Sequence, residues 1–353
     1  MDALQVETSA LLRHRREEIV ATAVERQWER WPGLRESFSD AQIASTIRDT
    51  RFHVDFLGSA LWADEQGLFD DYVRWVKVLF LNLELPIEWL TGSLNDVRAA
   101  IDATLEPQAA ALATRTIDVA LESLEDLEAE LPSFMRPDLP HAALAVRYVG
   151  SILGGDRHAA VQIVNAALED GVSVKDLYTH VFGRAQSELG RLWQMNRITV
   201  AQEHYATAVT QMVMSQLFPY VFQEEKNGFT LIAACVGGEL HEIGMRMVAD
   251  FFEMGHWDTH YLGANTPAPA IVEATAEKGA DVLALSTTMA FHVPDVADVV
   301  EAVRADTRTR AVKVIVGGYP FNLVPDLWKR VGADGYARNA PQAVSLADEM
   351  VCA

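Results

Sequence analysis

The pattern that most constrains the fold lies in residues 229–353, where short apolar runs alternate with helical segments. Strand-like runs occur at residues 231–236, 259–262, 282–285 and 312–316, with a weak fifth run at 335–337. Apolar strands separated by helices are typical of a parallel sheet that is covered on both faces. The pattern predicts a flavodoxin-like (Rossmann-like) domain over residues 228–353, whose ligands bind at the carboxyl ends of the strands.

Two helical regions are predicted before this domain. In residues 1–130 the apolar residues recur at helical spacing and no strand-like run occurs, which predicts an all-helical, globin-like domain. Three prolines in residues 131–140 indicate a linker. Residues 141–224 form four amphipathic segments joined by short loops, which predicts a four-helix bundle. We therefore expect a multidomain chain of α and α/β classes.

Local signals predict where some helices end. Asp40 is expected to be an N-cap, and Pro86 is expected to mark a break or a helix start. Helical spacing then continues from Ile87 through Leu127.

Charge and cysteine content exclude several classes of function. The 353 residues carry a formal net charge of −21, and the longest basic run is the short segment 13–16. Nucleic acid binding requires a clustered basic surface, so neither DNA nor anionic membranes are expected partners. Cys235 and Cys352 form no disulfide framework, and the start of the chain does not resemble a signal peptide. A cytoplasmic location and no membrane-spanning segment are expected.

A histidine follows the first predicted strand, in the sequence Glu239-Leu240-His241-Glu242-Ile243-Gly244. A carboxylate beside a histidine can accept its second ring N–H, which fixes the tautomer and makes the other nitrogen a better metal ligand. Glu239 and Glu242 are both candidates for this role. Gly244 would let the start of the next helix approach a ligand closely. A histidine in such a loop, taken alone, is more often a solvated residue.

Further candidate residues follow other strands of the same sheet. Ser286 and Thr288 follow the third strand, and Gly317 and Gly318 follow the fourth. Hydroxyls also cap helices and glycines also form turns, so each signal is weak by itself. Together these motifs resemble the cobalamin-binding domain of methionine synthase, corrinoid proteins and coenzyme B12 mutases. The resemblance implies that the nucleotide tail of cobalamin enters the sheet and that His241 is the lower cobalt ligand. That family usually has Asp where Glu239 stands.

The second motif lies in the predicted bundle, where Trp193 is followed after nine residues by Glu203 and His204. A buried core tryptophan with exposed polar neighbours is the alternative interpretation. The motif is similar to the Trp-x9-Glu-His signature of light-sensing, adenosylcobalamin-dependent repressors, and the resemblance covers residues 141–353. It implies that Trp193 packs on the adenosyl group, that Glu203 contacts its ribose and that His204 binds cobalt after photolysis.

The first 130 residues do not resemble the DNA-binding domain of those repressors. The whole chain resembles photocobilins, in which a helical domain and a B12 module hold a bilin as well as cobalamin. The resemblance implies a biliverdin pocket, without a thioether link because residues 1–130 contain no cysteine. Core aromatics with one surface histidine, or a haem with His53 as its axial ligand, are the alternatives. Candidate residues of a bilin pocket are Arg51, His53, Trp62, Tyr72 and Trp75.

These resemblances predict a light sensor that is not an enzyme. Photolysis of adenosylcobalamin would change its assembly into a homo-oligomer or its binding to a downstream signalling protein. The alternative is a methylcobalamin carrier of a methyltransferase system. A mutase subunit is excluded, because 130 helical residues cannot supply a substrate barrel.

Overall fold

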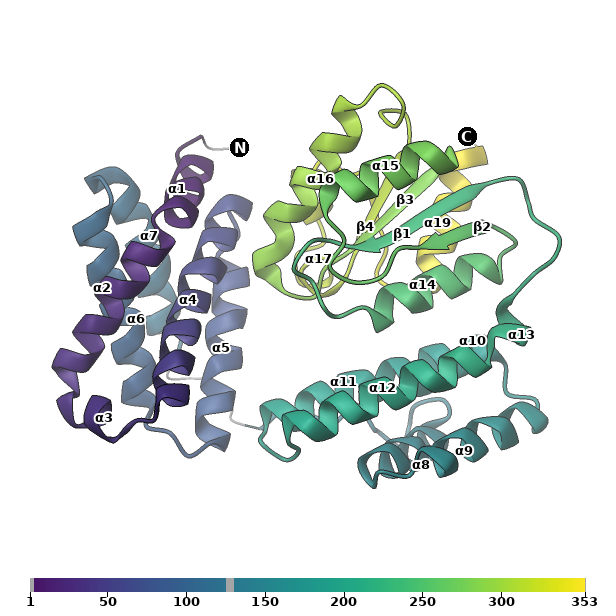
Figure 1. The fold of residues 1–353 in the computed structure, drawn as a ribbon, viewed down its shortest axis with the longest axis horizontal. Coiled ribbons are helices and arrows are strands. Elements are labelled where there is room, and N and C mark those ends of the chain that lie inside the picture. Colours follow the sequence, from purple (N-terminus) through teal and green to yellow (C-terminus); the bar gives the residue numbers. More distant parts are fainter. Residues whose placement is uncertain (1–2, 125–129, 353) are drawn as a thin grey trace. The chain divides into compact units, whose positions relative to one another are not determined.

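The computed structural model describes residues 3–124 and 130–352, which form two compact units (Figure 1). The first unit comprises residues 1–129 together with two later segments, residues 287–300 and 319–333. The second unit comprises residues 130–286, 301–318 and 334–353. Each unit is described by itself below.

The first unit begins with seven helices. They are α1 (Ala3–His14), α2 (Arg16–Arg30), α3 (Pro32–Ser37), α4 (Asp40–Ala63), α5 (Gln66–Asn82), α6 (Ile87–Thr104) and α7 (Pro107–Glu122). Ser39, and not Asp40, is the N-cap of α4, because the Ser39 side chain accepts from the backbone N–H of Gln42 in a capping box. The expectation for Asp40 was therefore wrong by one residue.

Proline also divides the last predicted helix of this region. The helical spacing from Ile87 through Leu127 predicted one continuous segment, whereas α6 ends at Thr104 and α7 begins at Pro107. Proline has no N–H to donate and suits the first turn of a helix, so it starts a new helix here. The expected end at Leu127 lies outside the described residues.

The later segments of the first unit pack on α4 and α5. The hydroxyl of Ser59 donates to the carbonyl of Ala290 at 2.5 Å, and the ring of Phe291 lies edge-on to Phe56 with centroids 5.1 Å apart. Tyr319 donates to Asp71 at 2.9 Å. These residues come directly after the ends of β3 and β4, so the chain that leaves those two strands belongs to the core of the first unit.

The second unit begins with a helical bundle. Its helices are α8 (Ala142–Leu153), α9 (Arg157–Glu169), α10 (Val174–Asp176), α11 (Gly183–Gln194), α12 (Val200–Gln216) and the short α13 (Phe218–Val221). A π-helical turn, Leu177–Phe182, joins α10 to α11 without a break. Tyr148, Tyr178 and Phe182 are fully buried in the bundle core. The bundle therefore has four long helical segments, as its sequence pattern predicts.

A five-stranded parallel sheet follows, in the order β2-β1-β3-β4-β5. Its strands are β1 (Thr230–Cys235), β2 (Asp258–Tyr261), β3 (Val282–Ser286), β4 (Lys313–Gly317) and β5 (Gly335–Tyr336). The helices that follow these strands are α14 (Ile243–Glu253), α15 (Ala268–Lys278), α16 (Val293–Ala305), α17 (Tyr319–Leu323), α18 (Leu327–Arg330) and α19 (Ala340–Cys352), with a 3₁₀ turn at Ala290–His292. Of these, the 3₁₀ turn, α16 up to Val300, α17 and α18 belong to the first unit.

The strand order is that of a flavodoxin-like domain, and the expected fold class is confirmed. Leu231, Ala233 and Cys235 of β1 share a core with α14 and α19, because alternate residues of a strand point to the same face. The chain reverses its direction across the sheet between β1 and β3, which places the ligand edge of such a fold beside the loop after β1. No described helix is long and apolar enough to cross a bilayer.

Candidate functional site

The loop between β1 and α14 holds His241 against a buried carboxylate. Glu239 is fully buried, and its Oε1 accepts from the backbone N–H of His241 at 2.9 Å. The same oxygen lies 2.6 Å from His241 Nδ1. Because a carboxylate only accepts hydrogen bonds, Nδ1 carries the proton, and in the neutral imidazole Nε2 keeps its lone pair. The imidazole is 59% exposed, so this nitrogen can reach a ligand.

The carboxylate also makes the imidazole more basic. The hydrogen bond to Glu239 raises the pKa of His241 above its usual 6.5, against the opposing effect of burial. The charges of Glu239 and of Glu203, from α12 of the bundle, act in the same direction. A more basic imidazole is a stronger metal ligand once its proton has left.

Asn265 fixes the shape of this loop. The backbone N–H of Gly238 donates to Asn265 Oδ1 at 2.7 Å, and Asn265 donates its own N–H to the carbonyl of Glu239 at 2.9 Å. Gly238 has a φ of 84°, a conformation that glycine adopts at little cost. The loop therefore holds the Glu239–His241 pair in place before any ligand binds.

Glu242, the other candidate partner of His241, has different contacts. Its Oε1 accepts from Gln211 Nε2 at 2.6 Å, and its Oε2 accepts from the hydroxyl of Tyr261 at 3.0 Å. Glu239 is thus the carboxylate that orients His241, while Glu242 joins the loop to α12.

The strand ends provide a row of small side chains. Cys235, Ser286 and Gly317 lie side by side at the carboxyl edge of β1, β3 and β4, and Gly318 follows with a φ of 103°. A Cβ atom on Gly317 would lie 3.0 Å from the carbonyl of Ala337, so the backbones are closely packed there.

The other two predicted positions of this sheet lie outside that row. Gly244, in the first turn of α14, has open space where a Cβ would be. Thr288 is a half-buried residue two positions beyond β3 and belongs to the first unit.

The bundle brings the Trp-x9-Glu-His residues to one end. Trp193 lies in the last turn of α11 and packs, partly buried, against the bundle core. Glu203 and His204 lie in the first turn of α12, which a capping box of Thr199 and Gln202 begins. His204 Nδ1 lies 2.6 Å from Glu203 Oε2, and the His204 side chain is 76% exposed. As at His241, a carboxylate occupies Nδ1 and leaves Nε2 available.

One side of α12 joins the bundle to the His241 loop. Along this side, Glu203 acts on His241 by its charge, Gln211 donates to Glu242, and Ser215 accepts from Arg246 Nη2 at 2.9 Å. Sequence reasoning missed Gln211 and Arg246. The spacing of eight residues from Glu203 to Gln211 and four from Gln211 to Ser215 was a signal for a shared helix face.

In the first unit, two of the five predicted bilin residues are in contact. His53 is buried, its Nδ1 lies 2.7 Å from the hydroxyl of Tyr72, and burial lowers its pKa to about 4. Arg51 forms a bidentate pair with Glu17, at 2.7 and 2.9 Å. Trp62 is half-buried and Trp75 is exposed.

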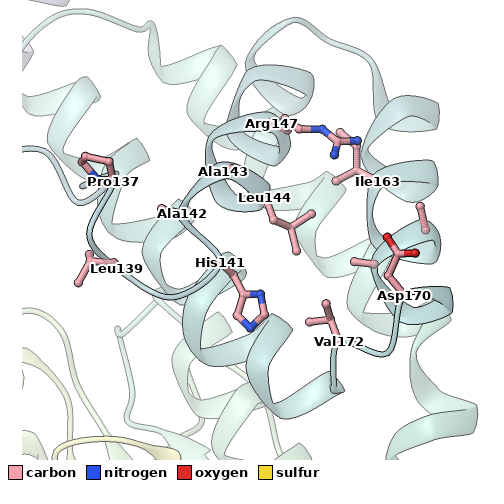
Figure 2. A pocket seen from close by; sticks show the side chains of 12 residues that line it. Pro137, Leu139, His141, Ala142, Ala143, Leu144, Arg147, Ile163, Asp170 and Val172 are labelled. Atoms are coloured by element: carbon pink, nitrogen blue, oxygen red, sulfur yellow. The ribbon is translucent and has the colours of Figure 1, made fainter.

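A cavity of about 460 Å³ lies elsewhere in the bundle, between residues 137–147 and 163–172. Figure 2 shows His141, Arg147 and Asp170 among its mostly apolar lining. None of the residues predicted from sequence lines this cavity.

Comparison with known families agrees with the fold and the His241 loop. Residues 229–345 match the family of B12 binding domains, and residues 144–218 match a second B12 binding domain family. Residues 2–124 match the phycobilisome protein family. The second unit is thus built from the two parts of a cobalamin-binding module.

Individual relatives define the family more closely. Dimethylamine corrinoid protein 1 of Methanosarcina acetivorans is 30% identical over 169 residues, which cover 47% of this chain and 78% of the relative. Dimethylamine corrinoid protein 3 of Methanosarcina mazei is 30% identical over 139 residues, which cover 39% and 81%. The chain belongs to the corrinoid protein family.

The solved structure of the monomethylamine corrinoid protein of Methanosarcina barkeri shares the fold. Its TM-score is 0.53 at 21% identity, and the match covers 60% of this chain and 99% of that one.

The described residues fit a corrinoid. A corrin ring supplies the four equatorial ligands of cobalt, so the protein needs to supply only axial groups. No group of three or more metal-ligating side chains occurs among the described residues, while His241 and His204 each present one oriented imidazole. The row of small residues at the sheet edge suits a ligand that enters beside the backbone.

Proposed function

We propose that the chain is a light-sensing adenosylcobalamin protein. His241 would be the lower axial ligand of cobalt, and Trp193, Glu203 and His204 would cover the upper face. Glu239, Gly244, Ser286, Thr288, Gly317 and Gly318 would complete the cofactor site. In this proposal the chain is a receptor and not an enzyme.

The observation that carries the proposal is the exposed Glu203–His204 pair. The carboxylate orients an imidazole whose Nε2 is available as a second axial ligand. Glu203 also offers a charged acceptor for a ribose hydroxyl, which a methyl group would not require. A bound adenosylcobalamin supplies a light-sensitive cobalt–carbon bond. The protein would supply an oriented imidazole on each side of it, and hydrogen bonds join α12, which carries His204, to Glu242 and Arg246 beside the His241 loop.

We propose a second chromophore, biliverdin, in the first unit. The match of residues 2–124 to the phycobilisome protein family supports this idea. The buried His53–Tyr72 pair would face the bilin, which would be held without a thioether by residues 1–130. Arg51 would have to leave Glu17 to bind a propionate, so His53 is the stronger candidate. A haem would instead bind Nε2 of His53, since Nδ1 already contacts Tyr72.

A corrinoid carrier of a methyltransferase system is the second candidate. The names of the relatives favour it, since they are dimethylamine corrinoid proteins. In that case a partner methyltransferase would approach the upper face, and His204 would have no role in light. Under the first proposal the partner is a second copy of the chain or a signalling protein, and nucleic acid is not involved.

Absorbance spectra of the full chain distinguish the candidates. The protein is loaded in the dark with adenosylcobalamin and biliverdin, passed through a desalting column, and measured before and after green light. We expect retained cobalamin whose spectrum changes to that of a bis-histidine form. In His204→Ala only the final spectrum should differ. Gel filtration before and after light measures any change of assembly.

Each contrary result has a definite meaning. Loss of all cobalamin on the column would contradict the cobalamin site itself. Equal affinity for methyl- and adenosylcobalamin, with no His204-dependent spectrum, would favour the carrier. Absence of a red absorption band after desalting would contradict the bilin site alone.

A further inference from the structure

We infer that a hydrogen-bond chain in the bundle, formed by the buried Tyr148 and Thr210 and the half-buried Gln186 and Thr207, positions Glu203 and so holds His204 ready to bind through Nε2. These four are positioning residues, because they act through Glu203. The inference rests on the proposed role of His204, but its first test needs no cofactor.

The inner half of the chain fixes the amide of Gln186. Thr210 is fully buried, and its hydroxyl donates to the carbonyl of Ala206 at 2.9 Å. Its oxygen must therefore accept, and it lies 3.1 Å from both the hydroxyl of Tyr148 and Gln186 Nε2. The amide nitrogen of Gln186 points to Thr210, which leaves its oxygen facing the other way.

The outer half ends at the Glu203 carboxylate. Thr207 Oγ1 lies 3.2 Å from Gln186 Oε1 and 2.9 Å from Glu203 Oε1. One hydroxyl proton thus has two acceptors. The carboxylate is nearer and charged, so it receives the proton in this structure. The other oxygen, Oε2, is then left for His204 Nδ1 at 2.6 Å.

The two acceptors of Thr207 lower the cost of moving Glu203. If a ribose hydroxyl draws Glu203 away, the Thr207 proton can turn to Gln186 Oε1. No half-buried hydroxyl is then left unpaired, an outcome that would otherwise cost stability. With no ribose bound, Glu203 would take up the position it has in this structure and would again hold His204 in the Nδ1-protonated tautomer.

The test replaces Thr207 by valine, which keeps the shape of the side chain and removes the hydroxyl. Thr207→Ser should restore the interaction, and Gln186→Leu tests the second acceptor. The matched control is Thr275→Val, a buried helical threonine of the same unit that bonds only to the carbonyl of Ile271. The first readout is the ¹⁵N NMR spectrum of histidine side chains in the full-length apoprotein, with His204→Ala for assignment.

We expect His204 to be Nδ1-protonated in the wild type, in Thr207→Ser and in Thr275→Val, and to become a tautomer mixture in Thr207→Val. The second readout is the bis-histidine fraction of protein loaded with hydroxocobalamin. This fraction should be lower in Thr207→Val, by an amount that corresponds to a roughly tenfold weaker His204–cobalt interaction, with the His241 ligand retained.

An unchanged tautomer in both Thr207→Val and Gln186→Leu would overturn the inference. An altered tautomer with unchanged bis-histidine fraction would overturn its link to cobalt. An altered tautomer in a protein that retains no cobalamin would keep the positioning chain and reject the proposed function.

Discussion

Two glutamate–histidine pairs repeat the same chemistry at the site. Glu239 holds His241 and Glu203 holds His204, in each case with 2.6 Å between a carboxylate oxygen and Nδ1. The first carboxylate is fully buried and the second is half-buried on the bundle. The buried pair is pre-organised by its loop, whereas the bundle pair depends on neighbouring side chains for its orientation.

The first prediction concerns the pKa of His241. NMR titration of the apoprotein should give a value above 6.5, because Glu239 stabilises the imidazolium. Glu239→Gln should lower it, since the charge is lost. Glu242→Gln is the control, because Glu242 bonds to Gln211 and Tyr261 instead.

The raised pKa has a defined effect on stability. The Glu239–His241 pair adds to the free energy of unfolding. This contribution is fully present below pH 6.5 and is lost as the pH rises through the pKa of His241 in the folded state. Identical His241 titrations in the two glutamine variants would show that Glu239 is not the source.

The second prediction concerns His53, whose burial lowers its pKa to about 4. In the unfolded chain the His53 imidazole takes up a proton near pH 6.5, whereas in the folded protein it stays neutral until about pH 4. The free energy of unfolding is therefore highest above pH 6.5 and decreases as the pH falls toward 4. The loss amounts to about 3 kcal/mol in the free energy of unfolding. Denaturant titrations of the full chain from pH 7 to pH 4.5 should show part of this loss, and His53→Phe should reduce the slope. An equal slope in both proteins would rule out this role for His53.

At the scale of elements, α12 connects the two halves of the proposed cofactor site. Its N-terminus carries Glu203 and His204, and its middle bonds to the His241 loop through Gln211. Across the loop, α14 contributes Ile243, Met247 and Phe251 to the bundle core. The apolar contact holds the bundle on α14, while polar contacts dominate beside His241. Polar contacts exchange with water more easily, so this is the side at which we expect a ligand to enter.

The third prediction concerns the start of α12. Thr199 caps the helix through a capping box with Gln202. Thr199→Ala should lower the free energy of unfolding by about 1 kcal/mol and loosen the first turn that carries His204. Denaturant titration measures the first effect, and hydrogen exchange of the 203–207 amides measures the second. Ser187→Ala, an exposed hydroxyl that bonds only within its own helix, should change neither. Equal exchange in both variants would contradict the prediction.

For the whole molecule, the second unit contains both glutamate–histidine pairs, while the segments that follow β3 and β4 belong to the first unit. Ser286 and Gly317 end those strands, and the chain then enters a core that contains Phe56 and Tyr72.

The fourth prediction is that cobalamin stabilises the chain by mass action. At a free concentration of 100 times Kd, the free energy of unfolding should rise by about 2.7 kcal/mol. His241→Ala should lose most of this gain, because the axial ligand is absent. His158→Ala, an exposed histidine on α9, is the control. Thermal unfolding of apo- and cobalamin-loaded protein measures the difference. An equal gain in His241→Ala would exclude His241 as a cobalt ligand.

The sequence alone determined the fold class and the positions of the two histidine motifs. Strand-like apolar runs and helical spacing are local signals, so every strand of the sheet was predicted to within about one residue at each end. Helix ends are harder to predict from the sequence. Ser39 and Asp40 can both cap a helix, and Pro107 lies within an otherwise unbroken apolar spacing.

Only the tertiary structure decided which side chains meet. The sequence favoured Glu239 as the partner of His241 with Glu242 as its rival, and the loop geometry selects Glu239. The chain from Tyr148 to Glu203 joins three helices, so no spacing along one segment reveals it. Such contacts depend on how helices pack against one another, and packing is set by the whole core rather than by any local pattern.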